Sequence, residues 1–242
     1  MPTMNEVMDG LRIKIFADGA KVEEMAVLVR DPRIKGFTTN PTLMRQAGVD
    51  DYDRFVKEIT SAITELPISF EVFSDDFSDM ERQALALREF GANVYVKIPI
   101  TDTQRRSATP LMRRLADAGV SVNATALMTL AQVRAVANAL ADGPPAIVSV
   151  FAGRIADAGV EPEPLMREAK ALLEGHANLE LLWASPREVL NIVQADRAGC
   201  DIITATPDLL RKLELLGRDL DDFSLATVRM FRDDAVAARY EF

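Results

Sequence analysis

Histidine and cysteine are nearly absent from this chain of 242 residues, which contains one of each, His176 and Cys200. A single cysteine cannot form an intramolecular disulfide, so the disulfide-rich secreted folds are excluded. A single histidine cannot supply a two-histidine metal site, and it argues against Ser-His and Cys-His catalytic triads. Chemistry in this chain therefore has to come from carboxylates, lysine, arginine, amides and hydroxyls.

The sequence also lacks long apolar runs and a basic stripe. No run reaches the roughly 18 residues of a membrane helix, and the N-terminal MPTMNEVMDG has no signal-peptide pattern. The net charge is −9, and the nearest thing to a basic patch, Arg105-Arg106 with Arg113-Arg114, is small and interrupted. We therefore expect a cytoplasmic protein that binds neither membranes nor nucleic acid. An anionic substrate would need locally placed arginines.

Short runs rich in β-branched residues recur along the chain, and segments with the apolar spacing of helices lie between them. The eight runs are 11–17, 35–39, 68–73, 93–98, 121–125, 146–151, 179–184 and 201–206. Helical spacing is clearest at 80–90, 129–140, 164–173 and 186–197, and 221–239 forms one more helix at the C-terminus. The polar residues at the ends of successive runs are 21 to 36 residues apart, which is the length of one strand–helix unit.

Eight such units predict an α/β protein with a single domain over residues 1–242. The predicted fold is a (β/α)8 TIM barrel with an extra C-terminal helix. A doubly wound open sheet is the main alternative. In a barrel, catalytic groups lie at the carboxyl ends of the strands, so the polar residues at those ends are the candidates.

Lys97 is the most informative strand-end residue because it lies in an otherwise apolar run, VYVKIPI. A buried ammonium is costly unless it is paired or loses its proton. An unprotonated lysine attacks carbonyl groups and forms Schiff bases. Glu71 and Asp18 end neighbouring strands and could move protons around an iminium ion. The structural alternative is a lysine at the solvent edge, or one merely paired with Glu71 or Asp18.

Asp18 and Asn40 each have a local explanation as well as a functional one. Asn40 precedes Pro41, and Asn-Pro alone indicates a turn, whereas the functional interpretation has its amide binding a substrate hydroxyl. Asp18 precedes Gly19-Ala20, where a helix N-cap would fit. The residues alone leave both alternatives open.

Arg154 and Arg187 are the candidates for binding an anion. Arg187 follows Ser185 and Pro186, where the spacing predicts the start of a helix. A helix N-terminus beside an arginine suits a phosphate group. The alternative for each arginine is a surface salt bridge.

In this order the motifs resemble those of the transaldolases, including the short subfamily of fructose-6-phosphate aldolases. The resemblance extends from Phe16 to about Lys212. It rests on ADG (17–19), GFTTNPTL (36–43), FEV (70–72), VKIP (96–99), NATAL (123–127), SVFAGRI (149–155), ASPR (184–187) and GCDIIT (199–204). It implies a (β/α)8 barrel and a class I aldol reaction with neither cofactor nor metal, as we expect from the lack of metal-ligand and nucleotide-binding motifs.

The resemblance also implies roles for individual residues. Lys97 matches the lysine that forms the Schiff base with a ketose donor. Glu71 matches a glutamate that transfers protons through a bound water, which Thr125 helps to hold, and Asp18 matches the acid/base on the donor hydroxyl. The implied donor-binding residues are Asn40, Asn123, Ser149 and Phe151, and the implied phosphate-binding residues are Arg154, Ser185 and Arg187.

The implied reaction transfers a dihydroxyacetone unit from a ketose phosphate, such as fructose 6-phosphate or sedoheptulose 7-phosphate, to an aldose, as in the pentose phosphate pathway. Glu71 and Phe151 favour transaldolase, because the aldolase subfamily has glutamine and tyrosine there, although the chain length resembles the aldolases. The alternatives are an aldolase that uses free dihydroxyacetone, and a non-catalytic sugar-phosphate-binding barrel. The joint presence of Lys97, Glu71 and Asp18 argues against the latter.

Two departures from the family pattern bear on the substrate. The usual Ser-Phe-Arg or Ser-Phe-Lys is Ser185-Pro186-Arg187 here, after the bulky Trp183, and the usual Ser-Pro-Phe is SVF (149–151). We expect Trp183 and Pro186 to shape the sugar site. The expected partners are sugar phosphates, and the C-terminal helix could pack on its own barrel or on a second copy in a homo-oligomer.

Overall fold

The computed structural model describes residues 4–239. The chain divides into two compact units. Arg12–Leu210 forms the first, and the segments through Leu11 and from Arg211 onward form the second. The prediction of one domain over residues 1–242 stays a prediction.

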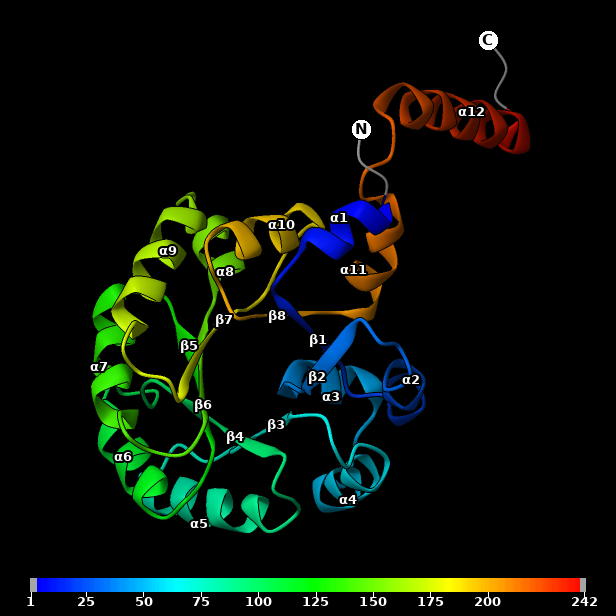
Figure 1. The fold of residues 1–242 in the computed structure, drawn as a ribbon. Helices are drawn as coiled ribbons and strands as arrows, with labels where there is room; N and C mark the ends of the chain where they lie inside the picture. The colour runs from blue at the N-terminus through cyan, green and yellow to red at the C-terminus, as the bar shows by residue number, and fades with distance from the viewer. Residues whose placement is uncertain (1–3, 240–242) are drawn as a thin grey trace. The chain divides into compact units, whose positions relative to one another are not determined.

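The first unit is a closed barrel of eight parallel strands in chain order, with β8 paired to β1 (Figure 1). The strands are β1 (Lys14–Asp18), β2 (Ile34–Thr38), β3 (Ile68–Glu71), β4 (Val94–Pro99), β5 (Val122–Leu127), β6 (Ala146–Val150), β7 (Leu179–Trp183) and β8 (Ile202–Ala205). Each of the eight predicted runs forms one of them. The predicted (β/α)8 barrel is therefore confirmed, and the open doubly wound sheet is wrong.

Helices alternate with the strands and surround them (Figure 1). They are α2 (Val22–Leu28), α3 (Pro41–Ala47), α4 (Tyr52–Ala62), α5 (Phe77–Arg88), α6 (Thr109–Asp117), α7 (Leu130–Leu140), α8 (Ala152–Asp157), α9 (Pro162–Leu173), α10 (Leu190–Arg197) and α11 (Pro207–Arg211). Within residues 4–239, none of the helices is long and apolar enough to cross a bilayer.

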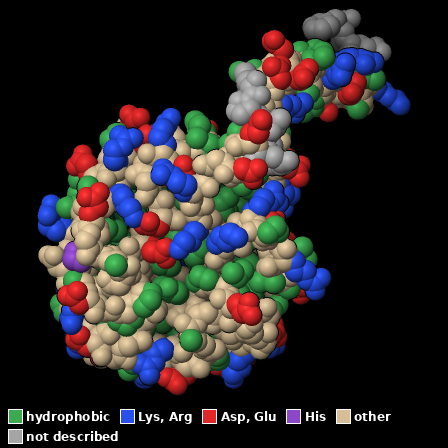
Figure 2. Space-filling view, in the orientation of Figure 1, with side chains coloured by type: hydrophobic (Ala, Val, Ile, Leu, Met, Phe, Trp, Pro, Cys, Tyr) green, Lys and Arg blue, Asp and Glu red, His purple; other side chains and the backbone are tan. Residues whose placement is uncertain are grey.

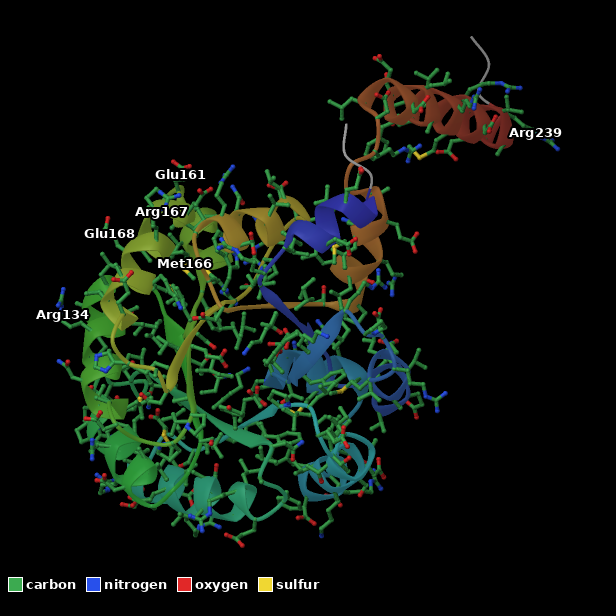
Figure 3. All side chains as sticks on the ribbon, viewed as in Figure 1. Arg134, Glu161, Met166, Arg167, Glu168 and Arg239 are labelled. Carbon is green, nitrogen blue, oxygen red and sulfur yellow. The ribbon has the colours of Figure 1, made fainter. Side chains whose placement is uncertain are left out.

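Helix α9 shows how these helices pack. Met166 is buried, whereas Glu161, Arg167 and Glu168 are exposed on the outer surface, where Figure 3 labels them. Apolar residues at helical spacing therefore cover the strands, and the charged residues of α9 other than the buried Glu163 reach solvent. On the face seen in Figure 2, basic and acidic side chains are interspersed. Elsewhere a charged side chain pairs with a buried one, as Arg167 does with Glu163 at 2.8 Å.

Alternate residues of each strand face the inside of the barrel. One interior cluster consists of Phe16, Ile147, Leu182, Ala184 and Ile202. The Phe16 ring lies against Gly36 on β2, where an added Cβ would stand 2.5 Å from the ring.

Trp183 lies between Leu182 and Ala184, so the alternation turns its side chain away from the interior. It is fully buried. Its ring therefore lies between the strands and the helices rather than inside the barrel, and the expectation that Trp183 shapes the sugar site stays a prediction.

The second unit is helical. It contains α1 (Met4–Gly10), the short helix η1 (Lys212–Leu215) and α12 (Leu220–Ala238). Asp219 caps α12 by accepting hydrogen bonds from the backbone N–H groups of Asp221 and Asp222. The predicted C-terminal helix is confirmed with a shift of one residue, and its part in a homo-oligomer stays a prediction.

Candidate active site

The barrel register brings the predicted catalytic residues to one end of the strands. Glu71 on β3 pairs in register with Lys97 on β4, and Lys97 pairs with Asn123 on β5. Asp18 is the last residue of β1. Because all strands are parallel and these residues lie toward their carboxyl ends, the side chains converge inside the barrel.

Lys97 is buried, with 9% of its surface exposed. Its Nζ donates to the Thr39 carbonyl oxygen at 2.5 Å and lies 2.9 Å from Glu71 Oε1. The interpretation of Lys97 as a residue at the solvent edge is therefore wrong, whereas the alternative of a pairing with Glu71 is observed. That pairing offsets the cost of burying the ammonium, and it also places a proton acceptor beside the amine.

Glu71 uses its two carboxylate oxygens differently. Oε2 accepts a hydrogen bond from Thr39 Oγ1 at 2.8 Å. Oε1, although close to Lys97 Nζ, is buried and has no aligned hydrogen-bond donor among the described residues. Tyr52 on α4 donates its hydroxyl to the Glu71 carbonyl at 2.9 Å, which ties the end of β3 to that helix. Burial and the charge of Glu71 raise the pKa of Tyr52, so this phenol stays a neutral donor.

Asp18 accepts hydrogen bonds on both carboxylate oxygens. Thr38 Oγ1 donates to Oδ1 at 2.8 Å, and Asn40 Nδ2 donates to Oδ2 at 3.0 Å. Thr38 Oγ1 also lies 2.5 Å from Thr204 Oγ1 on β8. Since the hydrogen of Thr38 goes to Asp18, Thr204 acts as the donor to Thr38. The N-cap interpretation of Asp18 is wrong, because Lys21 holds that position at α2.

The pKa of Asp18 lies above its ordinary value. Burial is the main cause, and the charge of Glu71 adds to it. The charge of Lys97 and the hydrogen bonds from Thr38 and Asn40 act in the opposite direction. A carboxyl whose pKa moves toward neutrality is suited to both accepting and returning a proton.

Asn40 serves two purposes. Its Oδ1 accepts from the Leu43 N–H at 2.9 Å and caps α3, whereas its Nδ2 binds Asp18. Asn40 thus has a local structural role as the cap of α3, and the same amide orients a candidate catalytic carboxylate. An amide nitrogen has two hydrogens, so one N–H remains for a further acceptor.

A second buried chain of polar groups lies beside Lys97. Ser149 Oγ donates to Asn123 Oδ1 at 2.7 Å, and Asn123 Nδ2 donates to Ser69 Oγ at 3.0 Å. The Thr125 side chain on β5 has no hydrogen-bond partner within residues 4–239, and its carbonyl accepts from Ile100 N–H at 3.0 Å. Phe151 packs against the interior apolar cluster.

The two arginines lie on α8 and on the loop after β7, and both are exposed. Arg187 holds Asp157 of α8 through a two-point contact, with Nε 3.0 Å from Oδ1 and Nη2 on Oδ2. Arg187 lowers the pKa of Asp157 by this contact, and the charge of Arg154 contributes. The salt-bridge alternative is therefore observed for Arg187, which is nevertheless about half exposed.

The predicted helix start at 186 is wrong, since α10 begins at Leu190. Instead, Asn191 Oδ1 accepts from the backbone N–H groups of Arg187 at 2.7 Å and Glu188 at 3.1 Å. The side chain of Asn191 thus occupies the backbone donors that a phosphate was expected to use.

Ser185 has a left-handed backbone, with φ 63°. Its carbonyl packs against Gly153, where an added Cβ would lie 1.6 Å from the oxygen. The glycine therefore lets the start of α8 approach the loop after β7. This contact brings the segments that carry Arg154 and Arg187 together.

Four residues form part of the site although the sequence predicted no role for them. They are Thr38, Thr39, Ser69 and Thr204. Alternation along the strands could have identified Ser69, two residues before Glu71, and Thr204, two residues after Ile202 on β8. Thr39 could not be found in this way, because it follows the last residue of β2.

The chain matches the family model described as transaldolase/fructose-6-phosphate aldolase over residues 15–241. It is 32% identical over 203 residues to a protein of Nitrosopumilus maritimus named probable transaldolase, covering 83% of this chain and 87% of that one. A protein of Rhizobium meliloti with the same name is 33% identical over 202 residues, covering 83% and 88%.

A crystal structure of a candidate phosphonomutase from Burkholderia cenocepacia J2315 has a similar fold. The TM-score is 0.58 at 14% identity, and the match covers 95% of this chain and 100% of that chain. At this identity the similarity concerns the fold alone.

Proposed function

Because this chain belongs to the transaldolase/fructose-6-phosphate aldolase family, we propose that it is a transaldolase. It transfers a dihydroxyacetone unit from a ketose phosphate to an aldose acceptor through a Schiff base on Lys97. The observation that carries this proposal is the burial of Lys97 with its Nζ 2.9 Å from Glu71 Oε1. Such a lysine has both the low-dielectric surroundings and the proton acceptor that imine formation requires.

The first step is formation of the imine. Lys97 transfers a proton to Glu71, and the resulting amine attacks the ketose carbonyl to form a carbinolamine. The carbinolamine hydroxyl then leaves as water with a proton from Glu71. The net change converts a carbonyl and an ammonium into an iminium and one water. The Thr125 hydroxyl makes no hydrogen bond to another residue within 4–239, so it is suited to holding that water.

The second step is cleavage between C3 and C4 of the donor. Asp18 takes the proton of the C4 hydroxyl, the bond breaks, and its electron pair passes into the iminium to form an enamine. The aldose phosphate leaves, and the enamine attacks the aldehyde of the acceptor, with Asp18 returning the proton. Water then hydrolyses the resulting iminium by the reverse of the first step, which releases the new ketose and restores the Lys97 ammonium. The raised pKa of Asp18 supports this role because the group must be a base in one direction and an acid in the other.

Substrate binding is divided between the interior and the rim. We assign the donor hydroxyls to Asn40, Asn123 and Ser149, with Phe151 as an apolar wall. We assign the phosphate to Arg154, Arg187 and Ser185. Arg187 has to exchange Asp157 for the phosphate, since a guanidinium binds either anion with the same pair of N–H groups.

A product assay on fructose 6-phosphate, with and without erythrose 4-phosphate, tests the proposal. We expect glyceraldehyde 3-phosphate to form catalytically only with the acceptor, as Glu71 and Phe151 predict. Steady release of free dihydroxyacetone without an acceptor would instead identify an aldolase. Absence of any borohydride-trapped adduct on Lys97 with both fructose 6-phosphate and sedoheptulose 7-phosphate would contradict the Schiff-base mechanism for these donors.

A further inference from the structure

Thr39 contacts both partners of the proposed proton exchange. It is fully buried. Its carbonyl oxygen accepts from Lys97 Nζ at 2.5 Å, and its Oγ1 lies 2.8 Å from Glu71 Oε2. Its backbone N–H donates to the Ser69 carbonyl at 3.2 Å, which holds the residue in line with β3.

The Thr39 hydroxyl has two acceptors and one hydrogen. Its Oγ1 lies 2.8 Å from Glu71 Oε2 and 2.9 Å from the Ser69 carbonyl oxygen. An ionised carboxylate is the stronger acceptor, so the hydrogen points to Oε2 while Glu71 is charged. Once Glu71 is protonated, the Ser69 carbonyl competes for the same hydrogen. Rotation of one O–H bond is enough to change between the two states.

We propose that Thr39 is a positioning residue for proton exchange between Lys97 and Glu71. Its hydroxyl holds Oε2, which leaves Oε1 as the oxygen that takes the proton. In that step an N–H bond of the Lys97 ammonium breaks, its electron pair becomes the lone pair of the amine, and an O–H bond forms at Oε1. The substrate role of this pair rests on the proposed function, whereas the link between Thr39 and the protonation of the pair does not.

Other ionisable groups also face the pair. Asp18 on β1 interacts electrostatically with both Lys97 and Glu71, and Tyr52 on α4 interacts with Glu71. Neither contacts Thr39 through a hydrogen bond among those described. A substitution confined to the Thr39 hydroxyl therefore leaves these groups in place.

The test uses Thr39→Val, which replaces the hydroxyl by a methyl group of similar shape, and Thr39→Ser, which keeps the hydroxyl. The probe is formaldehyde with cyanoborohydride, which methylates an unprotonated lysine, and the Lys97 peptide is quantified by mass spectrometry across pH. Without the Thr39 donor, Glu71 Oε2 is no longer fixed and Oε1 is no longer held beside Lys97 Nζ. We therefore expect Lys97 methylation to slow by about 5-fold or more at each pH in Thr39→Val and to match wild type in Thr39→Ser.

Identical methylation rates in wild type and Thr39→Val would overturn the proposal, even if Thr39→Val melts at a lower temperature. Should Thr39→Val not fold, Thr39→Ala removes the same donor and is read in the same way. Imine formation with fructose 6-phosphate should slow by about 10-fold or more in Thr39→Val and recover in Thr39→Ser. Because formaldehyde needs no sugar site, failure of wild type to form a sugar adduct would concern the proposed function and not Thr39.

Discussion

Two pairs in the molecule each join a cation to a carboxylate, but in opposite surroundings. Lys97 and Glu71 lie in the interior of the barrel, and Arg187 and Asp157 lie at its rim. Lys97 and Glu71 have side-chain exposures of 11% and 7%, whereas Arg187 and Asp157 have 46% and 49%. In the interior, removal of one partner leaves a buried charge uncompensated. At the rim, water screens the pair, and its formation contributes little to stability.

This difference fits the two tasks of the proposed enzyme. Groups that exchange protons benefit from fixed positions away from water, since nothing has to reorganise during the reaction. A group that binds and releases a phosphate benefits from a weak partner that can be displaced. The comparison therefore predicts large effects on rate from interior substitutions and smaller effects on affinity from rim substitutions.

Lys97→Met should have the largest effect. Without the amine no imine can form, and we expect turnover to fall by on the order of 10⁴-fold or more, with loss of the borohydride-trapped adduct. Lys57→Met is the matched control, because Lys57 is an exposed lysine paired with Asp53 on α4. Retention of turnover in Lys97→Met would show that the interior is only structural.

Glu71→Gln should come next. The amide keeps the shape of the side chain but cannot accept the proton of Lys97, so we expect adduct formation to slow by about 100-fold. Single-turnover trapping with borohydride measures this step directly. Unchanged turnover would mean that the proton is exchanged without Glu71.

Arg187→Ala tests the rim. Loss of a two-point contact to phosphate should raise KM for fructose 6-phosphate by about 10-fold or more, with a smaller change in kcat. Adduct formation from unphosphorylated dihydroxyacetone should not change. Arg167→Ala is the control, since Arg167 is an exposed arginine that pairs with Glu163 on α9.

Asp157→Asn should act in the other direction. It removes the negative charge that competes for Arg187, so we expect KM for the ketose phosphate to fall by about 2- to 5-fold. The effect should shrink as salt concentration rises, because salt screens exposed charges. A higher KM in this variant would indicate that Asp157 helps to orient Arg187 rather than to compete for it.

Asp18→Asn should have the smallest effect when stability is measured. Because folding raises the pKa of Asp18, its contribution to stability is full below the ordinary value of 3.8 and is lost as pH rises through the folded value. The stability of Asp18→Asn relative to wild type should therefore increase with pH. Urea denaturation between pH 4 and 8 measures this difference, and a constant difference would contradict it.

Strand-end residues could be identified from the sequence because each is a polar side chain in an otherwise apolar run. Lys97, Glu71 and Asp18 stand out in this way, and the spacing of such runs predicts the barrel. The loop after β7 could not be predicted, because Asn191 satisfies the backbone N–H groups of Arg187 and Glu188 through a contact that helical spacing does not encode.

The sequence by itself determined the eight strand–helix units and the chemistry available at their ends, since both follow from local patterns of apolar and polar residues. Only the tertiary structure decided which groups touch. It turned Trp183 away from the interior, joined Asn40 to Asp18, and brought Thr39 into contact with both Lys97 and Glu71. The physical reason is that closure of the barrel brings together residues as distant in sequence as Thr38 and Thr204. The pattern of apolar and polar residues along one strand carries no information about which side chains of another strand they will contact.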